Sequence, residues 1–402
     1  MSAIGRMSHL MRAAWIGLQL ESPPLVRRAV LPRIHEAKDI ARLLLKPQLP
    51  IDRLRGRGNG GPLDVAYIGL DNARPFVIDI LFEDKPGEER IGRAPFWRGE
   101  QLATIDADLV IVEAAKHVIR RLPGRNAIVL PQFVRHMVDV RGDWQQVKSR
   151  FHKKARHEWN QVQKQNYEYE ISHDAQDFEA FYRDMYLPTM RTRHGDLASP
   201  TSIDEAREYF RRGFLFWLKR DGQRACASLG YTEQGILHFL IMGVLAADEQ
   251  LMKEGVVTAM NLLRLHWANQ NGFAGVNFLG SNPFLNDGLF QYKRRWGGAI
   301  NVPPHLHRQL WIKINRRTPA VAEFLQSNPL ITVDGRGDLH GLICVDDLRQ
   351  VTPEQQVEWE KRYATPGLKS LQVRAVDDLI EQPAADRPRL VIPILPGATA
   401  GD

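Results

Sequence analysis

Cysteine is almost absent from this sequence. Cys226 and Cys344 are its only two cysteines among 402 residues, they lie far apart, and neither belongs to a Cys-x-x-Cys spacing. The sequence therefore argues against a disulfide framework and against a zinc site built on thiolates. Such sparse cysteine usage is typical of a reducing compartment, so we expect a cytoplasmic protein.

Long apolar runs are lacking as well. No run approaches the length that a bilayer-spanning helix needs, so we expect no transmembrane segment. The first 30 residues contain no acid before Glu21, but His9 and Arg12 interrupt their apolar run, which argues against a secretory signal. We expect this segment to be a loosely ordered or packed amphipathic extension, and a helix lying on a membrane surface is the alternative.

A Gly-rich phosphate loop is the third missing feature. Four glycines occur between Arg53 and Gly61, but a predicted strand follows them rather than a helix. That order is the wrong context for a nucleotide-binding fingerprint. We interpret residues 53–61 as a linker and expect a domain boundary near residue 60.

Charged and aromatic residues gather in the stretch Phe278–Gly298. It crosses a loop of Gly, Ser, Asn, Pro and Asp and ends on the cluster Tyr292–Trp296, where three cations stand beside two aromatics. Such a cluster favours an anionic partner with a flat or apolar part, for example a phosphate-bearing small-molecule cofactor. Over the whole chain, 54 Lys and Arg against 47 Asp and Glu favour anionic partners without requiring nucleic acid.

The hydrophobic pattern predicts an α/β protein. Before residue 141 the expected elements are helices over 32–46 and 114–122 and strands over 64–70, 76–82, 108–113, 127–130 and 133–140. After it they are helices over 147–165, 174–190, 202–212 and 255–271, and strands over 167–172, 214–219, 225–231, 236–244 and 276–279. The strands from 214 to 244 follow one another across short turns, which predicts an antiparallel meander.

The predicted helix over 147–165 is basic and amphipathic. Five apolar residues step by three or four positions from Val147 to Val162, while six cations, including Arg150 and Arg156, face a single acid, Glu158. Like charges at this density repel one another unless something compensates them. A contact with phosphate is therefore one interpretation, and a solvated basic face is the other.

Three motifs carry a resemblance to a known family. They are Val138–Val140 leading into the basic helix, Arg193-His194-Gly195 after the helix over 174–190, and the run Gly288–Gly297. With them, the segment from about Met137 to Leu330 resembles the GNAT acyltransferase superfamily, in the branch of the Fem peptidyltransferases and the acetyltransferase-like proteins encoded beside polysaccharide genes. The resemblance covers about half of the chain.

This resemblance implies a fold and a domain order. The fold is a GNAT-like mixed, largely antiparallel twisted sheet flanked by helices, present in two tandem lobes. We therefore expect an N-terminal helical extension and linker over 1–60, a degenerate first lobe over 61–140, a catalytic lobe over 141–330, and a C-terminal extension and tail over 331–402.

The resemblance also implies acyl-CoA as co-substrate. In GNAT enzymes the pyrophosphate lies on backbone amides at the start of the helix after the fourth strand, an anion site that any helix start favours. Here that helix starts at Gly255. Met252 and Val257 depart from the family pattern, which places a basic or amide residue and a small residue there. The expected cofactor contacts are Lys253, Gly255, Val256, Val257, Arg294 and Arg295.

Tyr292 is the candidate general acid for the leaving thiolate, because a tyrosine follows the corresponding strand in many GNAT enzymes; a packed aromatic is the alternative. Lys293 is the cation that we place beside the reacting centre. Asp287 and His238 are the candidate bases, although a histidine on a strand is commonly a core residue and a deprotonated amine needs no base. Acceptor contacts are expected from Arg150, Arg156, Arg193, His194 and Asn286.

No metal site is expected, since His305 and His307 share one face of a predicted strand but lack a third ligand. Three functions remain open. The first is an N-acyltransferase that moves an acyl group from acyl-CoA to an amine of a sugar, peptide or cell-envelope precursor. The second is a Fem-like transferase with aminoacyl-tRNA as donor, and the third is a non-catalytic scaffold linked to polysaccharide synthesis.

Overall fold

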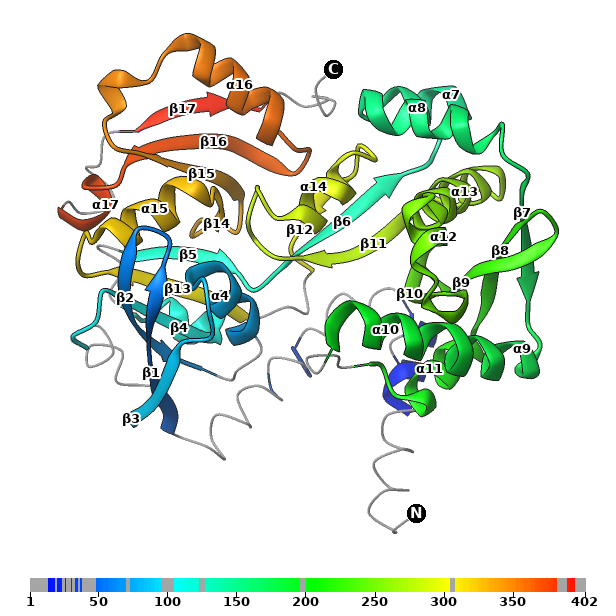
Figure 1. Ribbon diagram of the computed structural model, residues 1–402, viewed down its shortest axis with the longest axis horizontal. Coiled ribbons are helices and arrows are strands. Elements are labelled where there is room, and N and C mark those ends of the chain that lie inside the picture. The colour runs from blue at the N-terminus through cyan, green and yellow to red at the C-terminus, as the bar shows by residue number, and fades with distance from the viewer. Residues whose placement is uncertain are drawn as a thin grey trace, which may run out of the picture. The chain divides into compact units, whose positions relative to one another are not determined.

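The computed structural model divides the chain into two compact units (Figure 1). It describes residues 14–18, 20–23, 26, 30, 33–34, 37, 48–69, 73–95, 105–122, 127–195, 200–303, 308–381 and 389–394. Unit 1 comprises 1–27, 136–279 and 295–298, and unit 2 comprises 28–135, 280–294 and 299–402. The four consecutive segments expected from the sequence stay a prediction, because compactness alone does not show which segments fold independently.

Unit 1 is organised around a largely antiparallel sheet. Its strands follow one another in the order β6 (Val134–Asp139), β11 (Gly275–Ser281), β10 (Ile236–Val244), β9 (Gln223–Glu233), β8 (Gly213–Arg220) and β7 (Tyr167–Ser172). The pairs from β7 to β10 are antiparallel, which confirms the predicted meander, whereas β10 and β11 run parallel.

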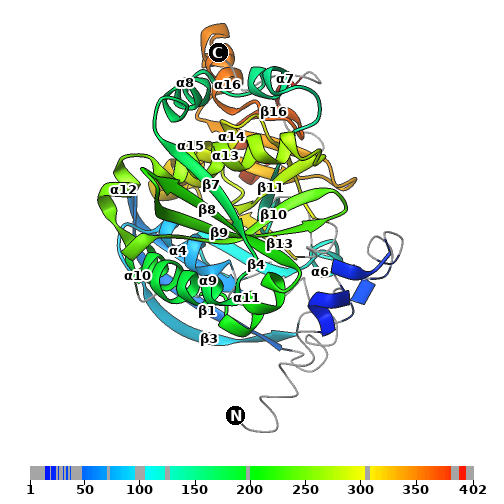
Figure 2. The same ribbon diagram turned by 90° about the vertical axis from the view of Figure 1, so that its right-hand side faces the viewer.

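Helices cover both faces of the strands β7–β10 (Figure 2). One face carries α9 (Ala175–Ala180), the π-helix η1 (Phe181–Tyr186), α10 (Leu187–His194) and α11 (Ile203–Phe210). The other face carries α13 (Val256–Gln270), which follows η3 (Leu245–Ala247) and α12 (Glu249–Lys253). Phe178, Phe181 and Phe210 are buried against Trp217 of β8, so aromatic packing fixes the first layer.

The basic helix predicted over 147–165 is two helices, α7 (Trp144–Ser149) and α8 (Lys153–Val162). The predicted apolar stripe is confirmed, since all five residues are buried. The helix is interrupted between Ser149 and Lys153 because the His152 side chain caps α8. The N–H of His152 donates to the carbonyl of Arg295 at 2.9 Å instead of continuing the helix. The apolar residues keep their spacing of three or four positions across the interruption. The hydrophobic pattern alone therefore could not show that two helices are present.

Unit 2 contains two sheets. The first has the order β3 (Gly87–Pro95), β1 (Gln48–Gly58), β2 (Gly61–Ile68), β4 (Leu109–Ala115), β13 (Arg308–Ile314) and β5 (Ala127–Pro131). The second has the order β14 (Leu330–Val333), β15 (Leu339–Val345), β16 (Leu368–Ala375) and β17 (Leu390–Pro393). The described residues of the unit also form α4 (Arg74–Leu81), α6 (Lys116–Ile119), α14 (Gly288–Arg294), β12 (Ala299–Asn301), α15 (Pro319–Ser327), η4 (Leu348–Gln350), α16 (Pro353–Tyr363) and α17 (Asp378–Glu381).

Both units contain a parallel strand pair joined through a helix. In unit 1 the connection from β10 to β11 contains α13, and in unit 2 the connection from β2 to β4 contains α4 and then β3. Each pair belongs to a sheet that also contains antiparallel neighbours. This is the mixed α/β fold class expected from the sequence, in an arrangement consistent with two tandem lobes.

Two predictions for unit 2 are wrong. The expected linker over 53–61 lies in the hairpin of β1 and β2, and the expected strand over 76–82 is the helix α4. The glycines serve packing rather than a hinge, since a Cβ on Gly56 would lie 2.9 Å from the ring of Phe82 and one on Gly58 would lie 2.8 Å from the carbonyl of Leu81. The end of α4 therefore rests directly on β1.

Among the described residues, no helix combines the length and apolar character needed to cross a membrane. Most of the first 47 residues lie outside the described part of the chain, including most of the helix expected over 32–46. His305 and His307 also lie outside it.

Candidate functional site

The strands β10 and β11 pair over only three positions. Ile236, Leu237 and His238 of β10 face Gly275, Val276 and Asn277 of β11, whereas β10 continues to Val244 and β11 to Ser281. Past His238, within the described residues, β10 pairs along one side only, with β9. The other side of β10 therefore presents peptide groups to which an extended ligand can add like a short strand.

The helix expected to start at Gly255 is α13, and its N-terminus has the backbone geometry that an anion site needs. Its N-cap Gly255 has φ = 88°, a left-handed conformation that glycine adopts without strain, and no side chain of that residue caps the helix. The amides of the first turn, at Val256 and Val257, are helix-start donors with the positive end of the helix dipole behind them. This turn follows β10 through η3 and α12.

Arg295 adds a positive charge to this helix start. Its guanidinium donates to Thr258 Oγ1 and to Glu158 Oε1, each at 3.1 Å, and lies 4.5 Å from the ring centre of Trp296. Thr258 belongs to the first turn of α13, and the Arg295 side chain is only 13% exposed. Of the three expected cations of the cluster, Arg295 is the one that the structure brings to the α13 start.

Charges of both signs surround the same helix start. Lys253 is exposed and pairs with Glu249 at 3.3 Å, and Glu254 pairs with Arg220. Arg193 lies near, with its Nη2 3.7 Å from the sulfur of Met252. His194 ends α10, and its side chain lies outside the described residues. Glu249 of α12 and its C-cap residue Glu254 therefore disfavour a bound anion, whereas Arg193 and Lys253 would favour one.

His238 is a buried histidine at the last paired position of β10. Its ring is 6% exposed, stacks on Tyr231 at 4.8 Å between ring centres, and lies with Nδ1 2.9 Å from Asn277 Nδ2. Its Nε2 lies 3.8 Å from a carboxylate oxygen of Glu233. The alternative that the sequence left open, a satisfied core residue, accounts for this environment better than a base open to substrate.

The stretch expected as a loop folds in part into α14, which belongs to unit 2. Tyr292, Lys293 and Arg294 lie on this helix, so unit 1 does not contain them. The guanidinium of Arg294 donates to the carbonyls of Lys361 and Ala364, at the end of α16. Burial lowers the pKa of Arg294 to about 10. This geometry makes Arg294 a helix-end clamp within unit 2.

The side chains that precede α14 also have hydrogen-bond partners within unit 2. Asp287 accepts from the N–H of Phe290 at 2.7 Å, as a helix-capping carboxylate does. Asn286 accepts from the Tyr363 hydroxyl and donates to the carbonyl of Ser327, both at 2.9 Å. Their expected roles as base and acceptor contact stay predictions, and the contacts described here belong to the packing of unit 2.

Two of the three arginines expected to bind substrate, Arg150 and Arg156, donate to backbone carbonyls. Arg150 donates to the carbonyl of Asp139 at 2.8 Å, and Arg156 donates to the carbonyl of Phe151 at 2.8 Å. The exposed cations of this region are instead Lys153, Lys154 and Lys164. A contact between the basic helices and a polyanion would therefore use the lysines first.

Two functional candidates were missed by the sequence analysis. Arg264 is buried on α13, donates to Ser228 Oγ at 2.9 Å and lies 4.1 Å from the ring centre of Phe239. Asn277 is buried on β11 beside His238. Polar residues at apolar positions of an otherwise regular pattern were the available signal, because a buried polar group needs a dedicated partner.

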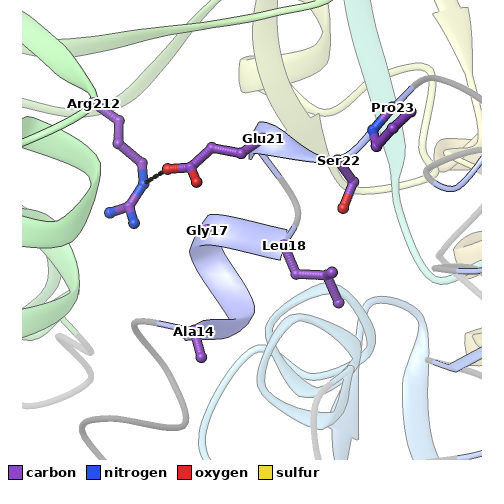
Figure 3. Close-up of a pocket in the computed structure, with 7 residues that line it drawn as sticks. All are labelled: Ala14, Gly17, Leu18, Glu21, Ser22, Pro23 and Arg212. Carbon is purple, nitrogen blue, oxygen red and sulfur yellow. Dashed lines mark hydrogen bonds and ion pairs between the residues drawn. The ribbon is translucent and has the colours of Figure 1, made fainter.

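A separate pocket of about 690 Å³ lies in unit 1 beside the helical turn over 14–18 (Figure 3). Leu18 lines it, and Glu21 and Arg212 form an ion pair at 2.5 Å across it. None of the expected site residues lines this pocket. Within the described residues, no group of three or more His, Cys, Asp or Glu is arranged to hold a metal ion.

Lys293 supplies a pH-dependent prediction for unit 2. It donates to the carbonyl of Gly280, and burial lowers its pKa from 10.5 to about 8. Between pH 8 and 10.5 the unfolded chain therefore binds more protons than the folded chain, so stability rises with pH. Lys293→Met should remove about 3 kcal/mol of this rise, measured by urea unfolding at several pH values.

Lys369→Met is the matched control for this measurement, since Lys369 also belongs to unit 2 but its side chain is 64% exposed. The control should keep the wild-type slope. An unchanged slope in Lys293→Met would show that Lys293 does not titrate in this range in the folded protein.

Comparison with known proteins indicates the class of enzyme to which this chain is similar. Residues 149–294 match the family model described as an acetyltransferase (GNAT) domain, and no curated protein matches the sequence. The matched segment extends from the end of α7 to the end of α14 and includes the separation of β10 and β11 and the start of α13. Over residues 149–294 the chain is therefore similar to a GNAT acetyltransferase domain, and this similarity supports an acyltransferase.

Solved structures match this chain at low sequence identity and low TM-scores. L-PGS from Bacillus licheniformis is 11% identical, with 67% of this chain and 86% of that chain covered and a TM-score of 0.34. FemX is 10% identical, with coverages of 76% and 96% and a TM-score of 0.37. A GCN5-related N-acetyltransferase from Kribbella flavida is 13% identical, with coverages of 72% and 96% and a TM-score of 0.24. At these values the likenesses carry no statement about donor or acceptor.

Proposed function

We propose that unit 1 transfers an acyl group from acyl-CoA to an amine of a sugar, peptide or cell-envelope precursor. The observation that carries this proposal is the separation of β10 from β11 in the same domain as the uncapped start of α13. The free side of β10 suits the amide-containing arm of coenzyme A, and the α13 start suits its pyrophosphate. The amine then attacks the thioester carbonyl directly, and the thiolate leaves.

The protein supplies position and electrostatics for this reaction. A backbone N–H of β10 beside the thioester would stabilise the oxyanion, and Arg295 would offset the charge of the phosphates. Tyr292 as general acid stays a prediction, since it lies on α14 of unit 2. His238 does not need to act as base, because an amine that arrives deprotonated attacks without one. A cytoplasmic location likewise stays a prediction.

The test is donor binding and turnover by the full chain. Acetyl-CoA and longer acyl-CoAs should raise the melting temperature, since a ligand that binds only the folded state stabilises it. With a panel of amines they should also release free thiol. Absence of both effects with every acyl-CoA would rule out the proposed donor.

A second candidate, aminoacyl-tRNA as donor, is favoured by the exposed lysines Lys153 and Lys154 at the start of α8 and by the two acids beside α13, which oppose a compact pyrophosphate. It predicts RNA binding that weakens steeply as salt rises, because each neutralised phosphate releases a counterion. The RNA affinity should be measured between roughly 50 and 200 mM salt, because the affinity of a protein that contacts several phosphates falls steeply over this range. A flat response, or no RNA binding, would exclude this donor.

A further inference from the structure

Asn277 lies at the position where β10 and β11 stop pairing. It is 1% exposed, and His238 is its register partner across the parallel pair. One end of its amide faces His238 Nδ1 at 2.9 Å. The other end, Oδ1, accepts from the N–H of Leu279 at 2.8 Å. A single buried side chain therefore links His238, the last residue of β10 paired with β11, to Leu279, the second residue of β11 beyond the pairing.

These two contacts fix the orientation of the amide and the tautomer of the histidine. A backbone N–H only donates, so the atom facing Leu279 must be the oxygen of Asn277. The NH₂ group then faces His238, whose Nδ1 must accept and therefore carries no proton. The ring proton lies on Nε2, on the side of Glu233. Asn277 thus requires the neutral form of His238.

Leu279 has an unusual backbone conformation. Its φ is 61°, in the left-handed region that costs a residue with a Cβ roughly 1–2 kcal/mol. A hydrogen bond that the N–H two residues later donates to an Asn side-chain oxygen is a known way to hold such a turn. The turn occurs in β11 immediately after the last residue paired with β10. It therefore changes the strand direction at the point of separation.

We propose that Asn277 is a positioning residue, oriented by His238, which holds Leu279 in its left-handed conformation and thereby fixes the separation of β11 from β10. This inference rests on the proposed function, because the opening it sets is the one proposed to bind the acyl donor. It also assigns His238 a role different from the base considered from the sequence: the ring orients Asn277 and does not touch the reacting atoms.

The decisive experiment combines Asn277→Ala with Leu279→Gly. Asn277→Ala removes the side-chain hydrogen bond, so the turn relaxes and the KM for acetyl-CoA should rise about 10-fold or more, with a smaller change in kcat. Glycine adopts φ = 61° without strain, so Leu279→Gly alone should stay within about 2-fold of the wild type. The double variant should regain most of the affinity that Asn277→Ala loses. Equal losses in Asn277→Ala and the double variant would overturn the proposal.

A second readout does not depend on the donor. Nitrogen NMR of the wild type should show His238 neutral with its proton on Nε2 at pH 7, and Asn277→Ala should give a mixture of tautomers. Hydrogen exchange along β10 should quicken in Asn277→Ala and return towards the wild-type rate in the double variant, whereas the N–H of residue 279 lacks its acceptor in both variants and should exchange fast in both. A proton on Nδ1 in the wild type, or β10 exchange that the Leu279→Gly change does not restore, contradicts the positioning role.

The two proposals fail in different ways. If wild-type protein binds no acyl-CoA, the proposed function fails, and the NMR and exchange data still decide the positioning role. If acetyl-CoA binds and reacts but Asn277→Ala leaves its KM and the β10 exchange rates unchanged, the proposed function stands and Asn277 has no part in setting the opening.

Discussion

Replacing Val257 with aspartate should weaken acetyl-CoA binding about 100-fold while the folded state becomes slightly more stable. Val257 lies in the first turn of α13 and is partly exposed. A carboxylate there would lie close to the expected pyrophosphate, and two like charges at about 4 Å repel by about 4 kcal/mol near a protein surface. The same carboxylate interacts favourably with the helix dipole, by about 0.3–1 kcal/mol.

These opposite signs make the prediction specific. A variant that simply damages the fold loses stability and binding together, whereas Val257→Asp should lose binding only. Val257→Asn is the matched control, because an asparagine side chain has nearly the shape of aspartate but no charge. This variant should bind acetyl-CoA within about 5-fold of the wild type. Calorimetric titration and thermal unfolding measure the two quantities. Binding of Val257→Asp as tight as that of Val257→Asn would mean that no phosphate lies at this helix start.

Removing the carboxylate of Glu113 should destabilise the protein by about 3–5 kcal/mol. Glu113 is fully buried on β4 of unit 2. Its Oε2 accepts from the Tyr67 hydroxyl at 2.5 Å and from the N–H of Ala73 at 3.1 Å. Its Oε1 accepts from Gln132 at 3.2 Å and lies 4.0 Å from the guanidinium of Arg308. Glu113→Ala removes the acceptor that these buried donors share.

Urea unfolding of the full chain measures this effect. Glu89→Ala is the control, since the Glu89 side chain is 68% exposed and its ion pair with Arg55 is 4.0 Å long, and it should change stability by less than about 0.5 kcal/mol. A loss below about 1 kcal/mol in Glu113→Ala would mean that its partners find other acceptors.

Glu113 also distinguishes the two units. Ala73 is the N-cap of α4, so an internal carboxylate lies at the helix start that corresponds in strand order to the start of α13. In unit 1 no side chain of the N-cap residue occupies the α13 start. An anionic donor would therefore meet the carboxylate of Glu113 at the helix start of unit 2, whereas the N-cap residue of α13 carries no such group.

Local signals were sufficient for several elements of unit 1. The meander of β8, β9 and β10 follows from alternating apolar residues and Gly-containing turns. The start of α13 follows from Gly255 and the helical period after it. The prediction of a strand over 76–82 was wrong because six apolar residues with one acid fit both the helical and the strand period. The segment is a helix, with Val77 and Leu81 packed in the core of the unit.

The stretch Phe278–Gly298 shows where local signals end. Its cations and aromatics were correctly recognised as unusual, but their partners lie far away in the sequence. Arg294 bonds to carbonyls 67 and 70 residues later, and Arg295 bonds to Glu158, 137 residues earlier. Two adjacent arginines thus belong to different units, which no spacing rule shows.

The sequence by itself determined the mixed α/β fold class, the meander and the helix start at Gly255, and its resemblance to a known family indicated the class of chemistry. Only the tertiary structure decided which polar side chains face that site and which are used for packing. The physical reason is that periodicity and caps depend on neighbours within a few residues, whereas burial, ion pairing and strand separation depend on residues brought together from distant parts of the chain. Asn277 became a candidate only when His238 was found beside it.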